Sequence, residues 1–412
     1  MTQVGRRGPE VAVTGLGAVS AAGIGVEANW QRVCEGISAA TLDPALDRFP
    51  ANNISCRVPP FDVTALVGSQ GRKRCDRTTQ LGLLAAREAL ADAGLSPESW
   101  DGARVGIVMG TSGGAATSYE TEYVRYVQEG PEWVSPLFGI TGPMNLLAGF
   151  LAIALRAFGP NMVVTTACAA GPTAIGTARH LLQADMCDIV LAGGAEAPLT
   201  GMLMSSLVQM GAVSRRVHDP AGASRPFDAD RDGMVAAEGA GVLVLERARD
   251  AAARGARPRA LVAGYGASAD GYHLSAPDPE GLGAERAIRQ ALADAGLSGT
   301  DVDHVNAHGS STPLNDVTEA AVIDRLYAAP AVTSTKGVVG HALGAAGALE
   351  AVYTVLAMEH GLVPPTANLT RQDPRIGIDV VAGKPREVAI RAATTHSFGF
   401  GGQNAVVTFT RP

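Results

Sequence analysis

Short apolar runs alternate along the chain with segments of helical spacing. The runs, several of them β-branched, predict buried strands at 10–16, 104–109, 163–166, 188–192, 241–246, 302–307 and 405–410. Segment 78–94 predicts a helix, because its apolar positions recur at helical spacing and a glycine closes it. Alternation of strands and helices predicts an α/β protein.

The second half of the chain repeats the first. The octapeptide Ala-Leu-Ala-Asp-Ala-Gly-Leu-Ser occurs at 89–96 and again at 291–298, 202 residues later, and each copy precedes a β-rich stretch. This distance is too long for a solenoid repeat and predicts one duplicated α/β unit. The predicted halves are 8–250 and 258–412.

Two stretches are less regular. Residues 37–78 contain the turn-forming pairs Asp43-Pro44 and Pro59-Pro60, and they predict a loop-rich segment. Residues 119–158 predict mixed helix and loop, apolar enough to contact a partner subunit or to line a pocket. The turn at 15–17 does not complete a Gly-x-Gly-x-x-Gly unit, so a dinucleotide-binding interpretation is set aside.

Composition favours a large, well-packed enzyme over a binding scaffold. The 412 residues are 46% hydrophobic and 18% charged, and they include 50 glycines. A formal net charge of −7 argues against bulk binding to nucleic acid or to an anionic membrane. No apolar run reaches the roughly 18 residues of a membrane span, and the first residues lack the apolar core of a signal peptide. We therefore expect a cytoplasmic protein that binds neither nucleic acid nor membrane.

One cysteine lies where a nucleophile is expected. Cys168 follows the predicted strand 163–166 and precedes a helix of small residues, and the positive end of a helix dipole favours the thiolate. The alternative is a small buried apolar residue, the usual state of a free cysteine. The five cysteines are scattered without Cys-x-x-Cys spacing, and they predict neither a zinc site nor a disulfide framework.

Two histidines and one lysine are further candidates. His308 and His341 each follow a predicted strand and precede glycine or a small residue. Lys336 is one of three lysines in a chain that otherwise uses arginine, which indicates a need for a compact ammonium, although chance retention also explains it. The glycine-rich segment 394–403 is predicted to be a turn whose backbone amides stabilise an oxyanion. The other histidines, interpreted as structural or exposed, are at 180, 218, 273, 304, 360 and 396.

Four separated motifs carry these residues in a fixed order. They are Thr-Ala-Cys-Ala-Ala-Gly at 166–171, Val-Asn-Ala-His-Gly-Ser-Ser-Thr at 305–312, Lys-Gly-Val-Val-Gly-His-Ala-Leu-Gly-Ala-Ala-Gly at 336–347 and Ser-Phe-Gly-Phe-Gly-Gly-Gln-Asn at 397–404. The chain is similar in these motifs to the β-ketoacyl-acyl-carrier-protein synthases of the thiolase superfamily. The resemblance implies the thiolase fold, which is five-layered αβαβα and built from two pseudo-symmetric halves. It also implies a dimer and decarboxylative Claisen condensation.

The resemblance also implies a role for each catalytic candidate. The cysteine takes the acyl chain as a thioester, and the two histidines hold the malonyl thioester while carbon dioxide is lost. The lysine, paired with a glutamate, orders this cluster, and two backbone N–H groups form the oxyanion hole. No metal or organic cofactor is required, since the substrates are carried on the phosphopantetheine of acyl carrier protein. The implied catalytic residues are Cys168, His308, His341, Lys336, Glu350 and Phe400.

The subclass stays open at this point. The cysteine with two histidines fits an elongating synthase, whereas a catalytically idle chain-length-factor-like subunit lacks the cysteine. Segment 314–319 and Gln403 resemble the ketosynthase subunit of type II polyketide systems, but 311–313 and the Gly-Phe-Gly-Gly frame resemble the fatty-acid enzymes. We favour polyketide or polyene assembly over fatty-acid elongation. The partner is expected to be a second copy or a chain-length-factor-like subunit.

Less specific residues complete the predicted site. By resemblance, Ser310 and Thr312 line the pantetheine tunnel. Gly113 and Leu207 align with positions where fatty-acid synthases often carry larger side chains, so the acyl pocket is expected to extend toward the subunit interface. A turn residue with positive φ and no pocket role is the alternative for Gly113. The candidate substrate-binding residues are Gly113, Leu207, Ser310, Thr312, Phe398 and Gly401.

Basic residues at two places are candidates for docking an acidic carrier protein. On a chain of net charge −7, such clusters supply the local positive field that this encounter needs. An ordinary solvated face is the alternative. The residues are Arg72, Lys73, Arg74, Arg215 and Arg216.

Overall fold

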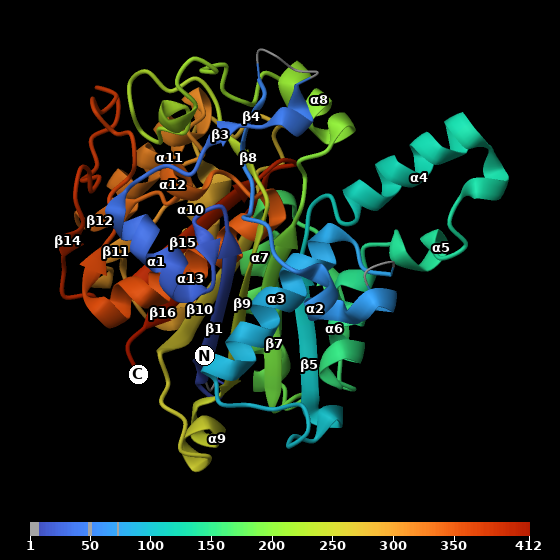
Figure 1. The fold of residues 1–412 in the computed structure, drawn as a ribbon. Helices are drawn as coiled ribbons and strands as arrows, with labels where there is room; N and C mark the ends of the chain where they lie inside the picture. The colour runs from blue at the N-terminus through green and yellow to red at the C-terminus, as the bar shows by residue number, and fades with distance from the viewer. Residues whose placement is uncertain (1–7, 48–51, 72–73) are drawn as a thin grey trace.

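Strands from both halves of the chain meet in one continuous mixed sheet (Figure 1). The computed structural model describes residues 8–47, 52–71 and 74–412. The sheet strands of the first half are β1 (Val11–Ser20), β2 (Gly23–Ile24), β5 (Val105–Gly110), β6 (Asn161–Val164), β7 (Ile189–Glu196) and β9 (Gly239–Arg247). Those of the second half are β10 (Ala260–Ala269), β11 (His304–Asn306), β12 (Ala331–Thr333), β15 (Ala392–Gly399) and β16 (Gln403–Thr410). Smaller sheets are formed by β3 (Thr41–Leu42), β4 (Ile54–Cys56) and β8 (Ala236–Ala237), and by β13 (Leu362–Val363) and β14 (Arg386–Glu387).

The order of strands in the large sheet is symmetric about its centre. It runs β12-β11-β15-β16-β10-β1-β9-β7-β5-β6, with β2 paired to β1. From β10 outward the strands follow in the same succession as from β1 outward. The central pair β1 and β10 is antiparallel, with Val13 opposite Ala260. The two halves are therefore related by an approximate twofold axis between β1 and β10.

Helices cover the sheet in layers. The helices are α1 (Val26–Glu35), α2 (Val63–Gly71), α3 (Arg77–Asp92), α4 (Ala116–Glu129), α5 (Phe138–Thr141), α6 (Leu146–Leu155), α7 (Ala170–Gln183), α8 (Gly201–Gln209), α9 (Ala248–Ala253), α10 (Leu282–Ala295), α11 (Pro313–Leu326), α12 (Lys336–Val339) and α13 (Ala346–His360). The two inner helices, α7 and α13, each contact strands of both halves, while α3 packs on β1 and α10 packs on β10 (Figure 1). This is the predicted five-layered αβαβα arrangement.

Glycines in β1 and β10 allow the outer helices to approach the sheet closely. A Cβ atom at Gly17 would lie 1.9 Å from the carbonyl oxygen of Ala85 in α3. In the second half, a Cβ atom at Gly266 would lie 2.1 Å from the carbonyl oxygen of Ala287 in α10. Only glycine fits at either place, so the two halves use the same packing solution.

Acidic residues of the repeated helices bond the same strands. The carboxylate of Asp92 accepts a hydrogen bond from the Leu16 N–H at 2.8 Å. Asp294, at the equivalent place in the second copy of the octapeptide, accepts from the Tyr265 N–H at 3.0 Å. The repeat in the sequence therefore corresponds to a repeated structural unit. The exact boundaries 8–250 and 258–412 remain predictions; α9 lies between the two halves.

Each inner helix follows a 3-10 turn whose first residue is left-handed. The turn η4 (Ala167–Ala169) precedes α7, and η7 (Leu343–Ala345) precedes α13. The φ angle is +48° at Ala167 and +42° at Leu343. The two turns contact each other, so the N-terminal ends of both inner helices meet where the two halves join.

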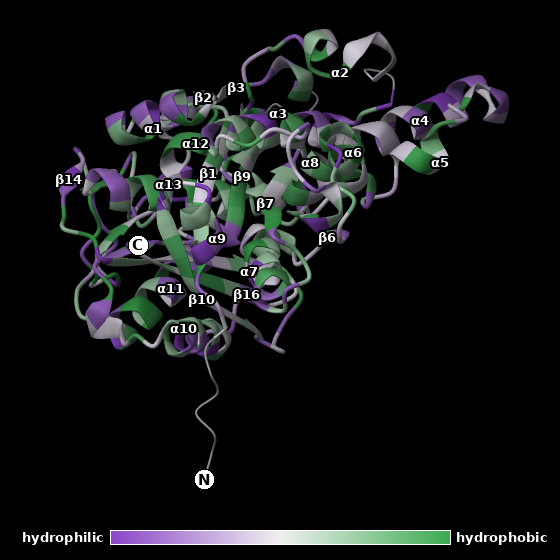
Figure 2. Ribbon diagram, turned by 90° about the horizontal axis from the view of Figure 1, so that it is seen from below, coloured by the Kyte–Doolittle hydropathy of each residue, from purple (hydrophilic) through white to green (hydrophobic). Residues whose placement is uncertain are grey.

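The interior of the protein is apolar and the outer helices carry the polar residues (Figure 2). The main apolar cluster joins β1, α7 and α13 and includes Leu16, Ile175 and Val352, all fully buried. Helix α13 is buried from Ala346 to Met358, which is why it lacks a polar face in the sequence. Among the described helices, none combines the length and apolar character needed to cross a membrane.

The structure corrects two of the element predictions. Segment 394–403 is not an open turn, because β15 and β16 form a hairpin there that reverses at Gly401 and Gly402, with φ of +78° and +69°. Segment 37–78 is less irregular than expected, since it contains α2, which is kinked at Gly68. Gly68 has a φ angle of +72°, so α2 is not one regular helix.

Helices α4 and α5 extend away from the rest of the protein as an arm (Figure 1). The arm belongs to the stretch 119–158 that was expected to contact a partner or to line a pocket. Its exposed large apolar residues include Tyr119, Tyr123, Val124, Tyr126, Val127, Trp133 and Ile140. Such a surface is typical of an interaction site.

Candidate active site

Cys168 lies in η4, at the N-terminal end of the inner helix α7. The strained residue before it, Ala167, turns the chain from β6 into the helix. The β15–β16 hairpin approaches this turn so closely that a Cβ atom at Gly399 would lie 3.0 Å from the Cys168 nitrogen. The thiol is thereby held against the hairpin and is 5% exposed.

Desolvation opposes ionisation of this thiol. Burial raises the pKa of Cys168 to about 11. The charge of Lys336 and the backbone N–H groups of Phe400 and Cys168 lower this pKa, whereas the charge of Glu196 raises it. The sequence-based expectation that the helix end favours the thiolate is thus outweighed by burial, and the resting group is a thiol.

His308 stands in the loop that follows β11. The Lys336 ammonium donates to the His308 carbonyl oxygen at 2.6 Å and lies 3.4 Å from its Nδ1. Because an ammonium only donates, Nδ1 is the acceptor and the imidazole proton is on Nε2. Burial lowers the pKa of His308 well below its usual range, and the positive charge of Lys336 adds to this effect. His308 is therefore a neutral donor.

His341 follows the short helix α12 and is held by main-chain bonds. Its N–H donates to the Val235 carbonyl oxygen at 2.8 Å, and its carbonyl accepts from the Ala237 N–H at 3.0 Å. The centroids of the His341 and His308 rings lie 5.2 Å apart, with the rings nearly perpendicular. Burial lowers the pKa of His341 well below its usual range, so it is neutral as well.

Lys336 forms a buried ion pair with Glu350 of α13. Both side chains are at most 2% exposed. The ammonium thereby links α12, the loop of His308 and the inner helix. The sequence predicted this pairing only through the family resemblance.

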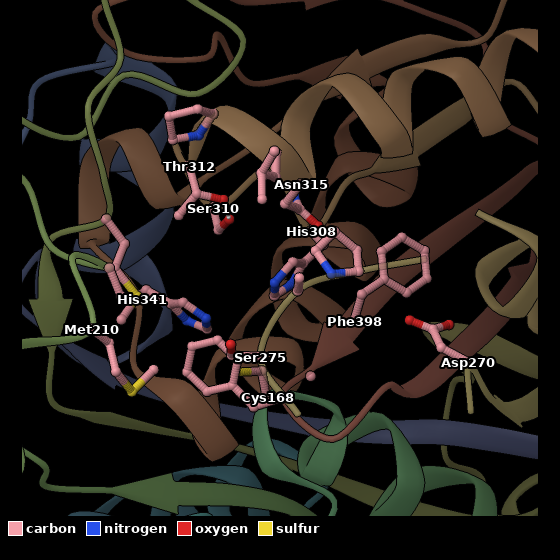
Figure 3. Close-up of a pocket in the computed structure, with 18 of the residues that line it drawn as sticks. Cys168, Met210, Asp270, Ser275, His308, Ser310, Thr312, Asn315, His341 and Phe398 are labelled. Carbon is pink, nitrogen blue, oxygen red and sulfur yellow. Dashed lines mark hydrogen bonds between the residues drawn. The ribbon is translucent and has the colours of Figure 1, made fainter. Parts of the chain in front are cut away.

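These residues face one cavity of about 360 Å³ (Figure 3). Figure 3 shows the two imidazoles and Cys168 around the same space, with Ser310 and Thr312 on the wall. The predicted site residues that line the cavity are Cys168, His308, Ser310, Thr312, His341, Phe398 and Phe400. Gly401 follows directly but is exposed. No group of three or more histidine, cysteine or acidic side chains suited to a metal occurs in the described part of the chain.

Gly113 and Leu207 lie outside the lining of this cavity. Leu207 is buried in an apolar cluster that also contains Cys168 and Met204. Gly113 has an ordinary φ angle, so the alternative of a positive-φ turn residue is wrong; the left-handed residue is Gly114, with φ of +58°. A pocket role for Gly113 and Leu207 remains a prediction.

The predicted docking residues are only partly described. Arg72 and Lys73 lie outside the described residues. Arg74 and Arg215 are exposed, and the half-buried Arg216 donates to the Asp230 carbonyl oxygen at 2.9 Å. The docking patch remains a prediction.

Glu196 is a site residue that the sequence analysis did not identify. It ends β7, is fully buried, and receives the N–H groups of Ser112 at 2.5 Å, Gly113 at 3.0 Å and Gly344 at 3.1 Å. It therefore ties a loop of the first half to η7, which follows His341. Burial raises the pKa of Glu196 to about 7. A single acid at the end of an apolar strand was the available signal.

Glu319 is the second such residue. It lies in α11, is 1% exposed, and accepts the N–H groups of His308 at 2.8 Å and Gly309 at 2.7 Å. The sequence analysis included it in segment 314–319 without a role. Its spacing of eleven residues from His308 places it on the helix that follows the histidine loop.

Comparison with known families gives two matches that together cover most of the chain. Residues 9–251 match the family described as "Beta-ketoacyl synthase, N-terminal domain". Residues 259–370 match the family described as "Beta-ketoacyl synthase, C-terminal domain".

Curated relatives match along nearly their whole length. Three of them are named 3-oxoacyl-(acyl-carrier-protein) synthase 2. The protein of Synechocystis is 40% identical over 409 residues, which is 97% of this chain and 98% of the relative. The protein of Vibrio cholerae is 38% identical over 411 residues, with 97% and 99% covered. The protein of Staphylococcus aureus is 36% identical over 406 residues, with 97% and 98% covered.

Solved structures of similar proteins share the fold. The ishigamide ketosynthase/chain length factor superposes with a TM-score of 0.92 at 35% identity, covering 98% of this chain and 100% of that one. A type II polyketide ketosynthase, bound to a hexaketide and in complex with its acyl carrier protein, gives 0.91 at 32% identity with the same coverage.

Proposed function

Because the chain belongs to the β-ketoacyl synthase family and is a ketosynthase enzyme, we propose that Cys168, His308 and His341 carry out its condensation in type II polyketide assembly. The observation that supports these roles is that one cavity is lined by a thiol and two neutral imidazoles. The substrates are thioesters on the phosphopantetheine of an acyl carrier protein.

Acyl loading comes first. The sulfur of Cys168 attacks the carbonyl carbon of an acyl thioester, and a new carbon–sulfur bond forms while the bond to the carrier thiol breaks. The Cys168 proton leaves with the carrier thiol. The N–H groups of Cys168 and Phe400 support this step, because both approach the sulfur and are available to the oxyanion.

Decarboxylation follows at the two histidines. Each neutral imidazole donates a hydrogen bond to the thioester oxygen of the malonyl group. The bond between the malonyl carboxylate and the adjacent carbon breaks, and carbon dioxide leaves. The electron pair of the broken bond stays on that carbon and forms an enolate. Lys336 supports this arrangement because it sets the His308 proton on Nε2.

Condensation completes the cycle. The enolate carbon attacks the acyl carbonyl on Cys168, a carbon–carbon bond forms, and the bond to the Cys168 sulfur breaks. The product is a β-ketoacyl thioester two carbons longer, on the carrier protein. The sulfur is left as a thiolate and takes up a proton, as its raised pKa requires.

Two observations bear on the pathway. The polyketide assignment is supported by the likeness to polyketide ketosynthase structures. It also agrees with the expectation, from the resemblance, that glycine at 113 widens the acyl pocket. Fatty-acid elongation is the second candidate, favoured by the 40% identity to a 3-oxoacyl-(acyl-carrier-protein) synthase 2. Both use the same chemistry and differ in the chain that is accepted.

The exposed arm supports a partner subunit. Its apolar surface, formed by residues such as Tyr123 and Trp133, suits burial against another chain. We propose a second copy or a chain-length-factor-like subunit, as in the ishigamide ketosynthase/chain length factor.

Mass spectrometry of the acyl species on Cys168 tests this function. The full-length protein, with and without a co-expressed candidate partner subunit, is incubated with malonyl and acyl carrier proteins of both pathways. We expect acyl chains on Cys168 and repeated two-carbon extension with the polyketide carrier. Saturated chains only, with the fatty-acid carrier only, would assign the fatty-acid pathway; no acyl group on Cys168 would refute the enzyme mechanism.

A further inference from the structure

A chain of hydrogen-bonded side chains lies behind the residues that line the cavity. It consists of Glu319, His396 and Tyr327, and His396 is fully buried. Nδ1 of His396 lies 3.3 Å from Oε1 of Glu319, and Nε2 lies 2.9 Å from the Tyr327 hydroxyl. The sequence indicated only a structural or exposed role for His396, and the mechanism above does not use it.

The direction of the protons in this chain follows from its acidic end. A carboxylate only accepts, so the His396 Nδ1 carries a proton and donates it to Glu319. When His396 is neutral, Nε2 is the acceptor of the Tyr327 hydroxyl proton. Thr394 also lies 3.2 Å from Nε2. Glu319 at Nδ1 and Tyr327 at Nε2 therefore fix the tautomer of His396, so that its Nδ1–H donates to Glu319.

Glu319 in turn holds the main chain that carries His308. One carboxylate oxygen accepts from the His308 N–H and the other from the Gly309 N–H, at 2.8 Å and 2.7 Å. The loop has little room to move, since a Cβ atom at Gly309 would lie 2.6 Å from the Cβ of Ser334. Rotation of the carboxylate would break at least one of these bonds and would shift His308.

We propose that His396 is a positioning residue for decarboxylation, an inference that rests on the proposed function. Its Nδ1–H fixes the rotation of the Glu319 carboxylate, which fixes the main chain at His308 and Gly309. The His308 ring is then kept 5.2 Å from that of His341, so that both reach one thioester oxygen. A misplacement of about 1 Å in such a site costs on the order of 100-fold in rate.

Two amide variants separate the two nitrogens of His396. In His396→Asn, the amide NH₂ occupies the place of Nδ1 and keeps the donor to Glu319. In His396→Gln, the longer amide reaches the place of Nε2 and leaves Glu319 without that donor. Release of carbon dioxide from malonyl carrier protein measures the step that depends on His308. Acyl loading of Cys168 serves as the control for a folded site.

We expect His396→Gln to lose at least about tenfold in carbon dioxide release, and His396→Asn to lose less than about threefold. Acyl loading should stay within about twofold of the unaltered protein in both variants, because the thiol does not depend on Glu319.

Equal losses in the two variants, unchanged carbon dioxide release in His396→Gln, or a parallel loss of loading would each overturn the positioning role. A measurement on the unaltered protein distinguishes failure of the positioning role from failure of the proposed function. If it loads acyl groups but releases no carbon dioxide from malonyl carrier protein, the proposed function itself has failed.

Discussion

The ammonium of Lys336 and the carboxylate of Glu350 form an ion pair that is almost fully withdrawn from solvent. The same ammonium bonds the His308 carbonyl and lies near its ring. One side chain therefore neutralises a buried acid and sets the proton of a histidine.

Removing one member of this pair should destabilise the protein. Glu350→Leu leaves the Lys336 ammonium buried without a counter-ion, and we expect a loss of about 3–5 kcal/mol in the free energy of unfolding, measured in denaturant. The double variant Lys336→Met/Glu350→Leu should recover most of this loss, because no charge is left buried. It should still lack decarboxylation, since nothing then sets the His308 tautomer. Wild-type carbon dioxide release by the stable double variant would contradict that role.

The two histidines should act on decarboxylation more than on acyl loading. In His308→Ala or His341→Ala we expect carbon dioxide release to fall by roughly 100- to 1,000-fold, because one donor to the enolate oxygen is missing. Loading of Cys168 should survive at least in part. His218→Ala, which alters an exposed histidine, is the matched control. Unchanged carbon dioxide release in either active-site variant would remove the assigned role.

Cys168 should become more reactive as the pH rises. Burial raises its pKa to about 11, and only the thiolate reacts with a haloacetamide. The fraction of thiolate grows about tenfold for each pH unit below the pKa, so the alkylation rate should rise steadily between about pH 7 and 10. Peptide mapping separates Cys168 from Cys34, whose pKa burial also raises to about 11. A rate that levels off near neutral pH would show that burial does not dominate.

A larger side chain at Gly113 should shorten the longest chain that the enzyme processes. A Cβ atom there would lie 3.2 Å from Cδ1 of Leu203, the mobile end of a side chain, and the φ angle is ordinary. Gly113→Met should therefore fold and should reduce product length by at least one two-carbon unit. Loading of a short acyl group should not change. Products of unchanged length would show that the residue at 113 does not limit the length of the acyl pocket.

Reversing the charge of the exposed docking candidates should weaken the encounter with carrier protein. For Arg74→Glu and Arg215→Glu we expect KM for acyl carrier protein to rise by roughly 3- to 10-fold and its salt dependence to flatten. Turnover of a small thioester should be unchanged. Arg249→Glu, on the exposed face of α9, is the control for net charge. An unchanged KM would indicate an ordinary solvated face.

Much of the fold was predictable because burial leaves a local mark on the sequence. The apolar runs at 104–109 and 241–246 correspond to β5 and β9 within a few residues. The hairpin at 394–403 was not predictable in this way. Thr394, Thr395 and His396 belong to the glycine-rich segment that was predicted to be a turn, yet all three are fully buried in β15. Thr394 and His396 find a polar partner in another segment, since the hydroxyl of Tyr327 lies within hydrogen-bond distance of both.

The residues of the candidate site likewise fall into those with a local signal in the sequence and those that depend on distant partners. Cys168 and His308 each follow a strand end, which local sequence displays, whereas His341 follows the short helix α12 and not the predicted strand. Glu196 also stands at the end of a strand, but its partner Gly344 is 148 residues away in the chain. Its bond to η7 forms only when the two halves pack together.

The paired turns before the inner helices have a consequence for the number of acyl chains that we expect one subunit to carry. In η4 the residue after the left-handed Ala167 is Cys168, and in η7 the residue after the left-handed Leu343 is Gly344. A Cβ atom at Gly344 would lie 2.5 Å from the Ser112 nitrogen, so no thiol fits there. Duplication of the unit therefore did not duplicate the attachment point. If Cys168 is the attachment point that we propose, we expect one covalently bound chain per subunit.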